Sequence, residues 1–312
     1  MTVKTSIQVE SFELTLTDIH DVGIDRLHGL SVAVGWPHRT EDWAFLLANG
    51  QGVAAIDPID RVLGSAMWFP MDENFATIGM VITSPRLQTQ GTGRWLMEHI
   101  LASIPFARLG LNSTRAARRL YRSIGFAIEA PVFQCQGEAR LSEARLSLET
   151  TKPADGAQLR AIKPEDLPDL AALDEIAFGA NRQRWLANLL PLSEGVALLR
   201  AGKIVAFALS RPFGRGHVIG PVVAASDEDA IAVTRPHVAR HQGRFLRLDT
   251  RHSSGAFAEF LLESGLSLFD TVTTMSLRAP WPVGPKRERD TDGKGHSEPH
   301  AITYGLASQA LG

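Results

Sequence analysis

The expected strands and helices occur in the same order twice along this chain, and this repetition limits its possible folds more than any other feature. In residues 11–140, a strand and two helical segments lead into three strands, followed by a helix, a strand, a second helix ending at Gly125, and a last strand. Residues 158–280 repeat this order, and Gly265 ends the corresponding helix. We therefore expect an internal duplication with a period of about 140 residues.

Apolar periodicity and turn signals define the individual elements. Residues 91–104 are expected to form a helix, because their apolar residues recur at intervals of three and four. The short apolar runs GVAAID and VLGSAMWF, separated by PIDR, predict a β-hairpin. Residues 114–124 are expected to form a helix that Ser113 or Thr114 caps.

A change of composition at residues 149–157 predicts a linker between the two repeats. This region is rich in Thr, Pro, Gly and charge. We expect an N-terminal domain at 1–148 and a C-terminal domain at 158–285. Residues 286–299 are charged and poor in apolar residues, which predicts a mobile loop. The apolar residues that follow predict a docking segment, so that 286–312 forms a loop and a segment packed on the body.

The composition argues against several classes of protein. The formal net charge is -2, so no strongly basic surface indicates a nucleic-acid partner. Cys135 is the only cysteine, which excludes an intrachain disulfide and a cysteine-based zinc site. No apolar run reaches the ~18 residues of a membrane-spanning helix, and residues 1–10 lack the apolar core of a signal peptide. We expect a cytoplasmic protein that uses no metal and contacts no membrane; a homodimer stays open.

The segment SPRLQTQGTGRWLM, residues 84–97, places Gly91 and Gly93 between a strand and a helix. A helix N-terminus has unpaired N–H groups and a partial positive charge, and glycines there let an anion lie directly on the backbone. Arg94 adds a cation in the first turn. We interpret the segment as a phosphate or pyrophosphate cradle. From spacing alone, a strand-to-helix turn shaped by glycine is an equal alternative.

This segment resembles the acyl-CoA loop of the GCN5-related N-acetyltransferase (GNAT) family, whose pattern is Gln/Arg-x-x-Gly-x-Gly/Ala after the fourth strand. Residues 112–126, NSTRAARRLYRSIGF, are similar to a later segment of the same family that contains Asn, Leu-Tyr and Gly-Phe. The resemblance covers residues 11–140 through motifs and residues 158–280 through element order. It implies an α/β (α+β) fold of two tandem GNAT-like domains, each with a mixed, mostly antiparallel sheet flanked by helices. It also implies an N-acetyltransferase that uses acetyl-CoA.

The resemblance further implies roles for individual residues. Tyr121 would protonate the leaving thiolate, and a phenol suits this role because its ordinary pKa of about 10 keeps it protonated at neutral pH. The alternative is a helix tyrosine that only packs. Val81, Ile82 and Thr83 would pair with the amides of the pantetheine arm, which Asn112 would also contact. The pyrophosphate would bind the loop residues Gln88, Thr89, Gln90, Gly91, Thr92, Gly93 and Arg94.

The second repeat is expected to lack a cofactor site. Asp227, Glu228 and Asp229 stand where the first repeat has Gln and Gly, and three carboxylates would repel a pyrophosphate. Leu261 takes the position of Tyr121, counted back from the glycine that ends the helix. We interpret this repeat as a degenerate GNAT-like domain that completes the acceptor pocket or stabilises the first domain.

Two segments provide candidates for the acceptor side. Asp72 and Glu73, in the turn before residues 75–83, are candidates for a general base; the alternative is a solvated hairpin tip. The stretch GWPHRTEDW would form an aromatic, partly acidic pocket for a cationic amine, and packing tryptophans with a surface aspartate are the alternative. Its candidate residues are Trp36, His38, Asp42 and Trp43.

The predicted function is therefore acetyl-CoA-dependent acetylation of a small amine by direct attack in a ternary complex. A non-catalytic acyl-CoA-binding regulatory module and the transfer of a different acyl group are the alternatives. The sequence does not distinguish among polyamines, amino acids, aminoglycosides, aromatic amines and protein lysines as acceptors.

Overall fold

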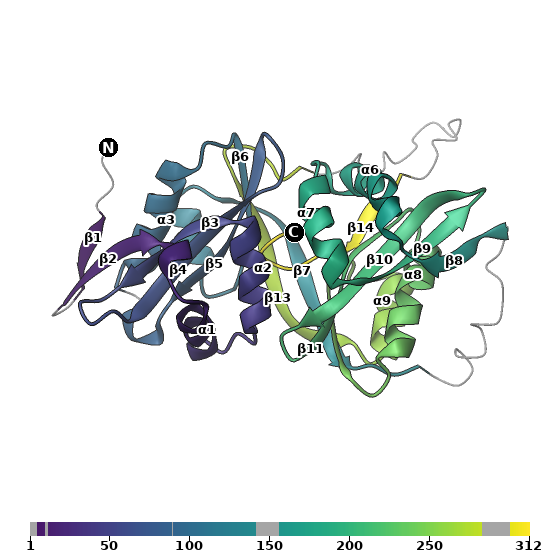
Figure 1. Cartoon of the computed structure of the whole chain (residues 1–312), viewed down its shortest axis with the longest axis horizontal. Coiled ribbons are helices and arrows are strands. Elements are labelled where there is room, and N and C mark those ends of the chain that lie inside the picture. Colours follow the sequence, from purple (N-terminus) through teal and green to yellow (C-terminus); the bar gives the residue numbers. More distant parts are fainter. Residues whose placement is uncertain (1–4, 10–11, 89, 142–155, 283–299) are drawn as a thin grey trace.

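The computed structural model describes residues 5–9, 12–88, 90–141, 156–282 and 300–312 (Figure 1). The first half contains β1 (Ser6–Val9), β2 (Phe12–Asp18), α1 (Ile24–Ala33), α2 (Thr40–Asn49), β3 (Gln51–Ile56), β4 (Val62–Pro70), β5 (Phe75–Thr83), α3 (Thr92–Ser103), β6 (Arg108–Ser113), α4 (Arg118–Ser123) and β7 (Ala127–Glu138). The second half contains β8 (Gln158–Ala161), α6 (Leu167–Phe178), α7 (Gln183–Leu189), β9 (Glu194–Arg200), β10 (Lys203–Phe213), β11 (Gly216–Ala224), α8 (Asp227–Arg240), β12 (Phe245–Thr250), α9 (Ala256–Glu263), β13 (Ser267–Leu277) and β14 (Ile302–Gly305).

The repetition of element order expected from the sequence is present in the structure. The series β5–α3–β6–α4–β7 has its counterpart in β11–α8–β12–α9–β13. The predicted hairpin is the antiparallel pair β3–β4. The mobile loop predicted at 286–299, and most of the linker predicted at 149–157, lie outside the described residues.

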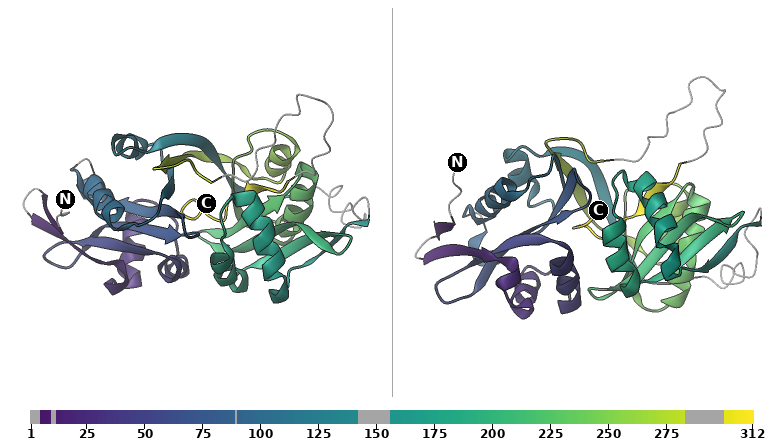
Figure 2. Two further views of the ribbon diagram at one scale, coloured as in Figure 1. Left: turned by 90° about the horizontal axis from the view of Figure 1, so that it is seen from above. Right: turned by 45° about the horizontal axis from the view of Figure 1, so that its top comes forward.

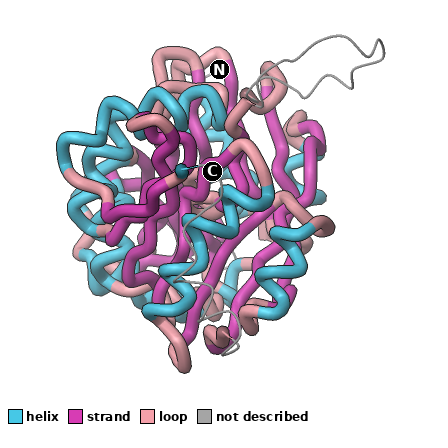
Figure 3. The backbone as a smooth tube through the Cα atoms, turned by 90° about the vertical axis from the view of Figure 1, so that its right-hand side faces the viewer, coloured by secondary structure: helices cyan, strands magenta, loops and turns pink. Residues whose placement is uncertain are grey.

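The described strands form one 14-stranded sheet in the order β1-β2-β3-β4-β5-β6-β13-β7-β12-β11-β10-β9-β8, with β14 beside β11. Neighbouring strands are antiparallel except for β5–β6 and β11–β12, which are parallel. The sheet is thus mixed and mostly antiparallel, as expected. Helices lie on both sides of the strands (Figure 3).

The last strand of each repeat lies in the other half of the sheet. β13 pairs with β6 and β7, and β7 pairs with β13 and β12. Figure 1 shows both strands passing through the middle of the molecule. The two repeats therefore share the centre of the sheet, and no boundary drawn along the chain divides the sheet into two independent halves.

Apolar side chains on the two faces of the first half belong to different cores. Leu27 of α1 and Trp43 of α2 pack on one face, whereas Leu96 and Ile100 of α3 pack on the other. Figure 2 shows these helices on opposite sides of the strands. The predicted cofactor loop, at the start of α3, and the GWPHRTEDW segment, at the start of α2, are therefore placed on opposite faces.

The core under α1 and α2 continues into the second half. Phe45 of α2 contacts Trp185 of α7, with ring centroids 6.0 Å apart, and Phe75 contacts Phe178 of α6 at 6.1 Å. Trp281 lies 5.1 Å from the Phe75 ring. Because one apolar core crosses the junction, the two halves have a fixed relative position in this structure.

Residues 300–312 run through the middle of the molecule. β14 pairs with β11, and the carbonyl oxygen of Ala310 accepts a hydrogen bond from Thr77 Oγ1 at 2.9 Å. The fully buried Arg182 donates to the carbonyl oxygen of Gly312 at 3.0 Å and forms an ion pair with the equally buried Asp174. These contacts fix the segment between the two repeats.

One helix begins later than expected. Residues 114–124 were predicted to be helical, but α4 begins at Arg118. The Thr114 hydroxyl accepts the backbone N–H of Ala117 at 3.4 Å, a local side-chain bond that favours a turn over a helix. Residues 114–117 accordingly form the turn that leads into α4.

Candidate functional site

β5 and β6 separate partway along their length. Their parallel register pairs four positions and ends at Ile78 opposite Leu111. Beyond this point Met80 adopts a positive φ of 51° and the β4–β5 register shifts, which is the geometry of a β-bulge. Val81, Ile82 and Thr83, the predicted pantetheine-binding residues, lie on the part of β5 that has left β6. Backbone groups on this part of β5 are therefore not paired with β6.

The turn before α3 requires a glycine at position 91. Gly91 is the N-cap of α3 and has a φ of +84°, a conformation that residues with a side chain rarely adopt. A Cβ atom at this position would meet nothing within 4 Å. The hydroxyl of Thr92, the next residue, is buried without a hydrogen-bond partner among the described residues. The turn thus combines a helix N-terminus, open space and an unsatisfied polar group.

The other predicted cradle residues differ in their surroundings. Gly93 packs against α4, since a Cβ there would lie 3.3 Å from Leu120 Cδ2. Arg94 donates to Ser123 Oγ at 2.6 Å and pairs with Glu98 at 3.3 Å on the surface. Gln88 is exposed and Gln90 half-buried, while Thr89 lies outside the described residues. The missing side chain at Gly93 therefore allows α3 to pack closely on α4, and this explains the glycine as well as ligand binding would.

Tyr121 lies on α4 in the core on the α3 face. Its ring contacts Phe126 with a centroid separation of 5.9 Å, and the residue is 6% exposed. Burial raises the pKa of the Tyr121 phenol above its ordinary value. The group therefore stays protonated at neutral pH, as a proton donor must.

Asn112 lies on β6 at the point of divergence, and both ends of its amide are engaged. Its Nδ2 donates to the carbonyl oxygen of Gln309 at 2.8 Å, and its Oδ1 accepts from Thr274 Oγ1 at 2.7 Å. These partners come from the second half of the chain. The side chain therefore connects β6 to residues 306–312 and to β13.

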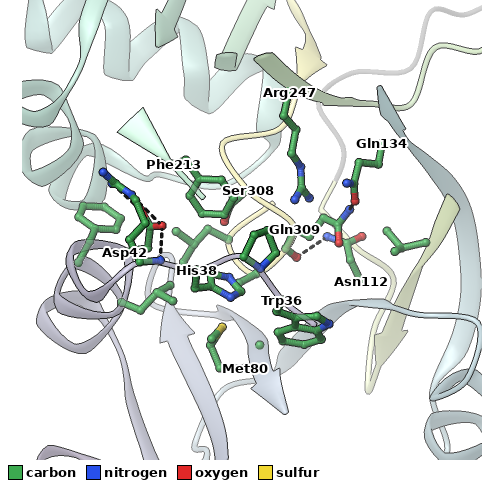
Figure 4. A pocket seen from close by; sticks show the side chains of 18 of the residues that line it. Trp36, His38, Asp42, Met80, Asn112, Gln134, Phe213, Arg247, Ser308 and Gln309 are labelled. Atoms are coloured by element: carbon green, nitrogen blue, oxygen red, sulfur yellow. Dashed lines mark hydrogen bonds and ion pairs between the residues drawn. The ribbon is translucent and has the colours of Figure 1, made fainter. Parts of the chain in front are cut away.

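A cavity of about 420 Å³ lies between the two halves on the α2 face (Figure 4). It reaches from the loop before α2 to the divergence of β5 and β6. Its walls come from α2, β5, β6, the β10–β11 hairpin, β13 and residues 308–311. Residues of the first half in its lining include Trp36, His38, Phe45, Ile78, Gly79, Met80 and Asn112.

The predicted acceptor segment contributes three of its four candidates to this cavity. Trp36, His38 and Asp42 line it. Trp43 does not, because its side chain points into the core, where its Nε1 donates to Ser31 Oγ at 3.1 Å. Burial lowers the pKa of His38 to about 4, so this imidazole is neutral at neutral pH.

The carboxylate of Asp42 is already satisfied within the chain. Its oxygens accept from Arg39 Nη2 at 2.9 Å and from the backbone N–H of Gly214 at 3.0 Å. These donors hold the pKa of Asp42 below its ordinary value despite the opposing effect of burial. Arg39, three residues earlier in the chain, therefore neutralises the wall that was expected to be acidic, and Gly214 of the second half adds a hydrogen bond that the sequence does not show.

The two candidate bases lie elsewhere. Asp72 Oδ1 accepts the backbone N–H groups of Asn74 and Phe75, both at 2.7 Å, as in a tight turn. Glu73 is exposed beside it. Neither residue lines the cavity, so their placement agrees with the solvated hairpin tip.

Several lining residues from the second half were not identified from the sequence. Arg211 and Phe213 end β10, Arg247 lies on β12, and Ser308 and Gln309 belong to the segment after β14. The sequence signal that could have identified the two arginines is their position inside the apolar strands KIVAFALSRPF and RFLRLDT. Arginine is rarely buried in such a strand unless it binds a partner.

Comparison with known proteins agrees with this architecture. Two models described as "Acetyltransferase (GNAT) domain" match residues 46–128 and 170–288, which together make up more than half of the chain. The chain belongs to the GNAT family of acetyltransferases. It carries two GNAT domains in tandem.

Proteins similar to this tandem GNAT acetyltransferase match it over most of their length. The Bacillus subtilis (strain 168) protein named uncharacterized N-acetyltransferase YitH is 24% identical over 300 residues, covering 95% of this chain and 98% of that protein. A putative acetyltransferase from Pyrococcus horikoshii is similar in structure, with a TM-score of 0.72 and 16% identity over 98% of both chains. A tandem GNAT protein from the clavulanic acid biosynthesis pathway has a TM-score of 0.62 at 13% identity, covering 86% of this chain and 99% of that one.

The first GNAT match contains Gly91 and Tyr121, and the second runs from α6 past β13. Within the described parts of this acetyltransferase, no helix is both long and apolar enough to cross a membrane. The same residues include no cluster of three or more His, Cys, Asp or Glu side chains that could hold a metal ion.

Proposed function

We propose that this acetyltransferase transfers the acetyl group of acetyl-CoA to a small amine bound in the cavity between its two domains. The observation that carries the proposal is that the cavity reaches the divergence of β5 and β6. Gly79 and Met80 of β5 and Asn112 of β6 line the cavity at this point. An amine in the cavity would thus meet an acyl group held along the free part of β5.

The residues before α3 fit the pyrophosphate of CoA. The Gly91 position leaves open space beside the N-terminus of α3, whose N–H groups and dipole favour an anion. The unsatisfied Thr92 hydroxyl is a further donor at this place. When bound, acetyl-CoA would supply a thioester whose acyl carbon is open to attack by an amine.

The chain's own residues would orient the amine and supply a proton. The amine nitrogen would form a bond to the acyl carbon as the carbon–sulfur bond breaks; the nitrogen would release one proton to solvent and the sulfur would gain one. Tyr121 would donate its hydroxyl proton to the departing thiolate and recover a proton from solvent. Its raised pKa keeps it in the donating form, and general-acid catalysis of this kind typically contributes 10²–10⁴-fold.

The second domain is proposed to have no cofactor site. β14 pairs with β11 at Val222, Val223 and Ala224, on the strand that corresponds to β5. The connection from β11 to α8, residues 225–226, is also shorter than the connection from β5 to α3, residues 84–91. The chain itself therefore occupies the edge that a pantetheine arm would need, and no room remains for a pyrophosphate loop.

Carboxylates at the start of α8 support the same interpretation. Asp227 accepts the backbone N–H of Phe257 at 3.0 Å and the hydroxyl of Tyr304, on β14, at 2.8 Å. Asp229 forms an ion pair with Arg200 at 2.6 Å. The Ser226 hydroxyl caps the N-terminus of α8, and the carboxylates in its first turn already complement the helix dipole and would repel an added anion.

Thermal unfolding with CoA tests the cofactor site. A specific ligand at 100 times its Kd stabilises a protein by about 2.7 kcal/mol, so millimolar CoA is expected to raise the midpoint by several degrees. Gly91→Ala should reduce this shift, because alanine is strained at a φ of +84° and adds an atom beside the helix N-terminus. The matched control is Gly202→Ala, where the φ of +78° is similar and the Cβ position is equally open, but the residue lies in the β9–β10 turn.

Two outcomes would count against the proposal. No shift of the wild-type midpoint with CoA would exclude the cofactor site. A normal shift together with no thiol release from acetyl-CoA across a wide panel of amines would instead indicate a non-catalytic acyl-CoA-binding module.

A further inference from the structure

Away from the exposed rim, the charged groups of the cavity wall do not pair one to one. Arg39 pairs with Asp42 at 2.9 Å, and Arg247 pairs with Asp249 at 2.7 Å. Arg211 has no carboxylate partner among the described residues. Two carboxylates of the lining, Glu41 and Asp270, are exposed at the rim and form no ion pair with it. Among the described residues, the buried wall of the cavity therefore carries one arginine, Arg211, that no carboxylate pairs directly.

Arg211 is buried to an unusual degree for an unpaired cation. It is 6% exposed, its Nη2 donates to the carbonyl oxygen of Ala307 at 3.1 Å, and its Nε is buried without a partner. In the described part of the chain, Nη1 makes no hydrogen bond. Burial lowers the pKa of Arg211 to about 10, which still leaves the guanidinium charged at neutral pH. Burying such a charge costs several kcal/mol unless a partner compensates it.

A second guanidinium lies at the same aromatic ring. The Cζ atoms of Arg211 and Arg247 lie 5.0 and 5.6 Å from the centroid of Phe213. Arg247 uses Nε and Nη2 to bind Asp249, which leaves its Nη1 without a hydrogen bond among the described residues. Figure 4 shows the Arg247 guanidinium extending from β12 toward Gln309 and the interior of the cavity. Two guanidinium groups with free donors thus flank one ring at the cavity wall.

From this arrangement we propose that Arg211 and Arg247 bind a carboxylate of the acceptor, so that the acceptor is an amine carrying one carboxylate. This inference rests on the proposed function of the cavity. A single net charge matches a carboxylate better than a doubly charged phosphate monoester. The rest of the lining is largely apolar and aromatic, and it includes Trp36, Phe45, Leu46, Met80, Phe213 and Val272. The substrate class that fits these walls is an α-amino acid with an apolar side chain.

The arrangement also gives the second domain a role. Arg211 and Arg247 lie on β10 and β12, whereas the divergence that receives the acyl group belongs to β5 and β6. The second domain would then bind the carboxylate while the first presents the thioester. Orientation of this kind places the amine nitrogen before the reaction begins.

Paired substrates test the inference directly. Leucine would be compared with isoamylamine and phenylalanine with phenethylamine, since each pair differs only in the carboxylate. We expect kcat/KM for thiol release to be roughly 10- to 100-fold higher for the amino acids, as charge-assisted hydrogen bonds imply. Calorimetric titration in the presence of CoA should show the same order of affinities. Glycine and O-phosphoethanolamine, tested alongside, distinguish a carboxylate from a phosphate.

Variants of Arg211 assign the preference to the residue. Arg211→Met should raise KM for leucine roughly 10- to 100-fold while changing KM for isoamylamine less than about twofold. Arg211→Lys keeps the charge and should retain part of the preference. Arg215→Met, an exposed arginine in the β10–β11 turn, is the matched control and should leave all four KM values unchanged. Stabilisation by CoA in each variant shows that the first domain is folded.

The outcomes separate this inference from the proposed function. If CoA does not stabilise the wild-type protein, the cofactor site itself is excluded. If CoA binds but the decarboxylated amines are used as well as the amino acids, the carboxylate site is overturned while the acetyltransferase site stands. Preference for the phosphate compound, failure of every amino acid to bind, or a preference for amino acids that survives in Arg211→Met would equally overturn it.

Discussion

At the scale of single residues, the two tyrosines of this chain have different surroundings and, we propose, different roles. Tyr121 lies on α4 in an apolar core, and its hydroxyl has no hydrogen-bond partner among the described residues. Tyr304 lies on β14, donates to Asp227 at 2.8 Å and stacks on His252 with centroids 4.3 Å apart. We therefore expect Tyr121 to act in catalysis and Tyr304 to act in stability.

Replacement of Tyr121 by phenylalanine tests the first half of this contrast. Loss of the proton donor should lower turnover by roughly 100-fold or more, whereas CoA affinity and the unfolding midpoint should change little. Steady-state thiol release and calorimetry with CoA measure the two effects. An unchanged turnover would exclude Tyr121 as the acid without affecting the fold.

At the scale of elements, the same strand–turn–helix unit has two different neighbours. In the first domain, β5 diverges from β6, and the turn before α3 leaves open space at Gly91. In the second, β14 lies against β11, and Tyr304 connects it to the first turn of α8. One copy of the unit thus has open space beside its helix N-terminus, while β14 pairs with the strand of the other copy.

Replacement of Tyr304 by phenylalanine tests the role of β14. Loss of a hydrogen bond to the half-buried carboxylate of Asp227 should lower the free energy of unfolding by about 1–3 kcal/mol, with little change in turnover. Denaturant unfolding measures the first effect and thiol release the second. Calorimetry should give one CoA per chain for the wild type and for this variant; a second site in either would contradict the proposal for the second domain.

At the scale of the whole molecule, exchange of β7 and β13 joins the two domains and builds the cavity between them. Each repeat completes the sheet of the other, and the cavity takes its walls from both. Buried titratable groups lie on both sides of the junction. His38 lines the cavity, and His237 of α8 contacts the carbonyl oxygen of Ala208 at 3.2 Å.

These histidines predict acid sensitivity. Burial lowers the pKa of both His38 and His237 from 6.5 to about 4, so the unfolded chain binds protons more readily than the folded one in this range. Their contribution to stability is present above pH 6.5 and is lost as the pH falls toward 4. For His237, which is 2% exposed, the loss is roughly 3 kcal/mol; for the half-buried His38 it is smaller.

Variants show whether these two residues cause the effect. His237→Gln and His38→Gln should flatten the decline of the unfolding free energy between pH 6.5 and 4 in denaturant titrations. His20→Gln is the control with the opposite sign, because Asp18 raises the pKa of His20, and its contribution is present at low pH and lost as the pH rises. An equal slope in all three variants and the wild type would refute the assignment.

Much of the local structure follows from the sequence alone. Apolar periodicity places the strands and helices, their repeated order indicates two tandem units, and the glycine-rich turn with Tyr121 points to one cofactor loop. The inferences about element positions and tandem units are confirmed because hydrophobic spacing and turn chemistry are properties of neighbouring residues, whereas the cofactor loop stays a prediction. Even so, the helix at 114–124 begins late, since Thr114 binds the backbone N–H of Ala117 and favours a turn.

Only the tertiary structure decides what lies around the site. The exchange of β7 and β13, the insertion of β14 beside β11, and the pairing of Asp42 with Gly214 all join residues far apart in the chain. No local pattern specifies such contacts, because they depend on how the packed elements fit together. The sequence by itself therefore determined the repeated GNAT units, and it predicts the cofactor turn. Packing between the repeats decided that Gly214 binds Asp42 and that Arg211 is buried in the cavity wall.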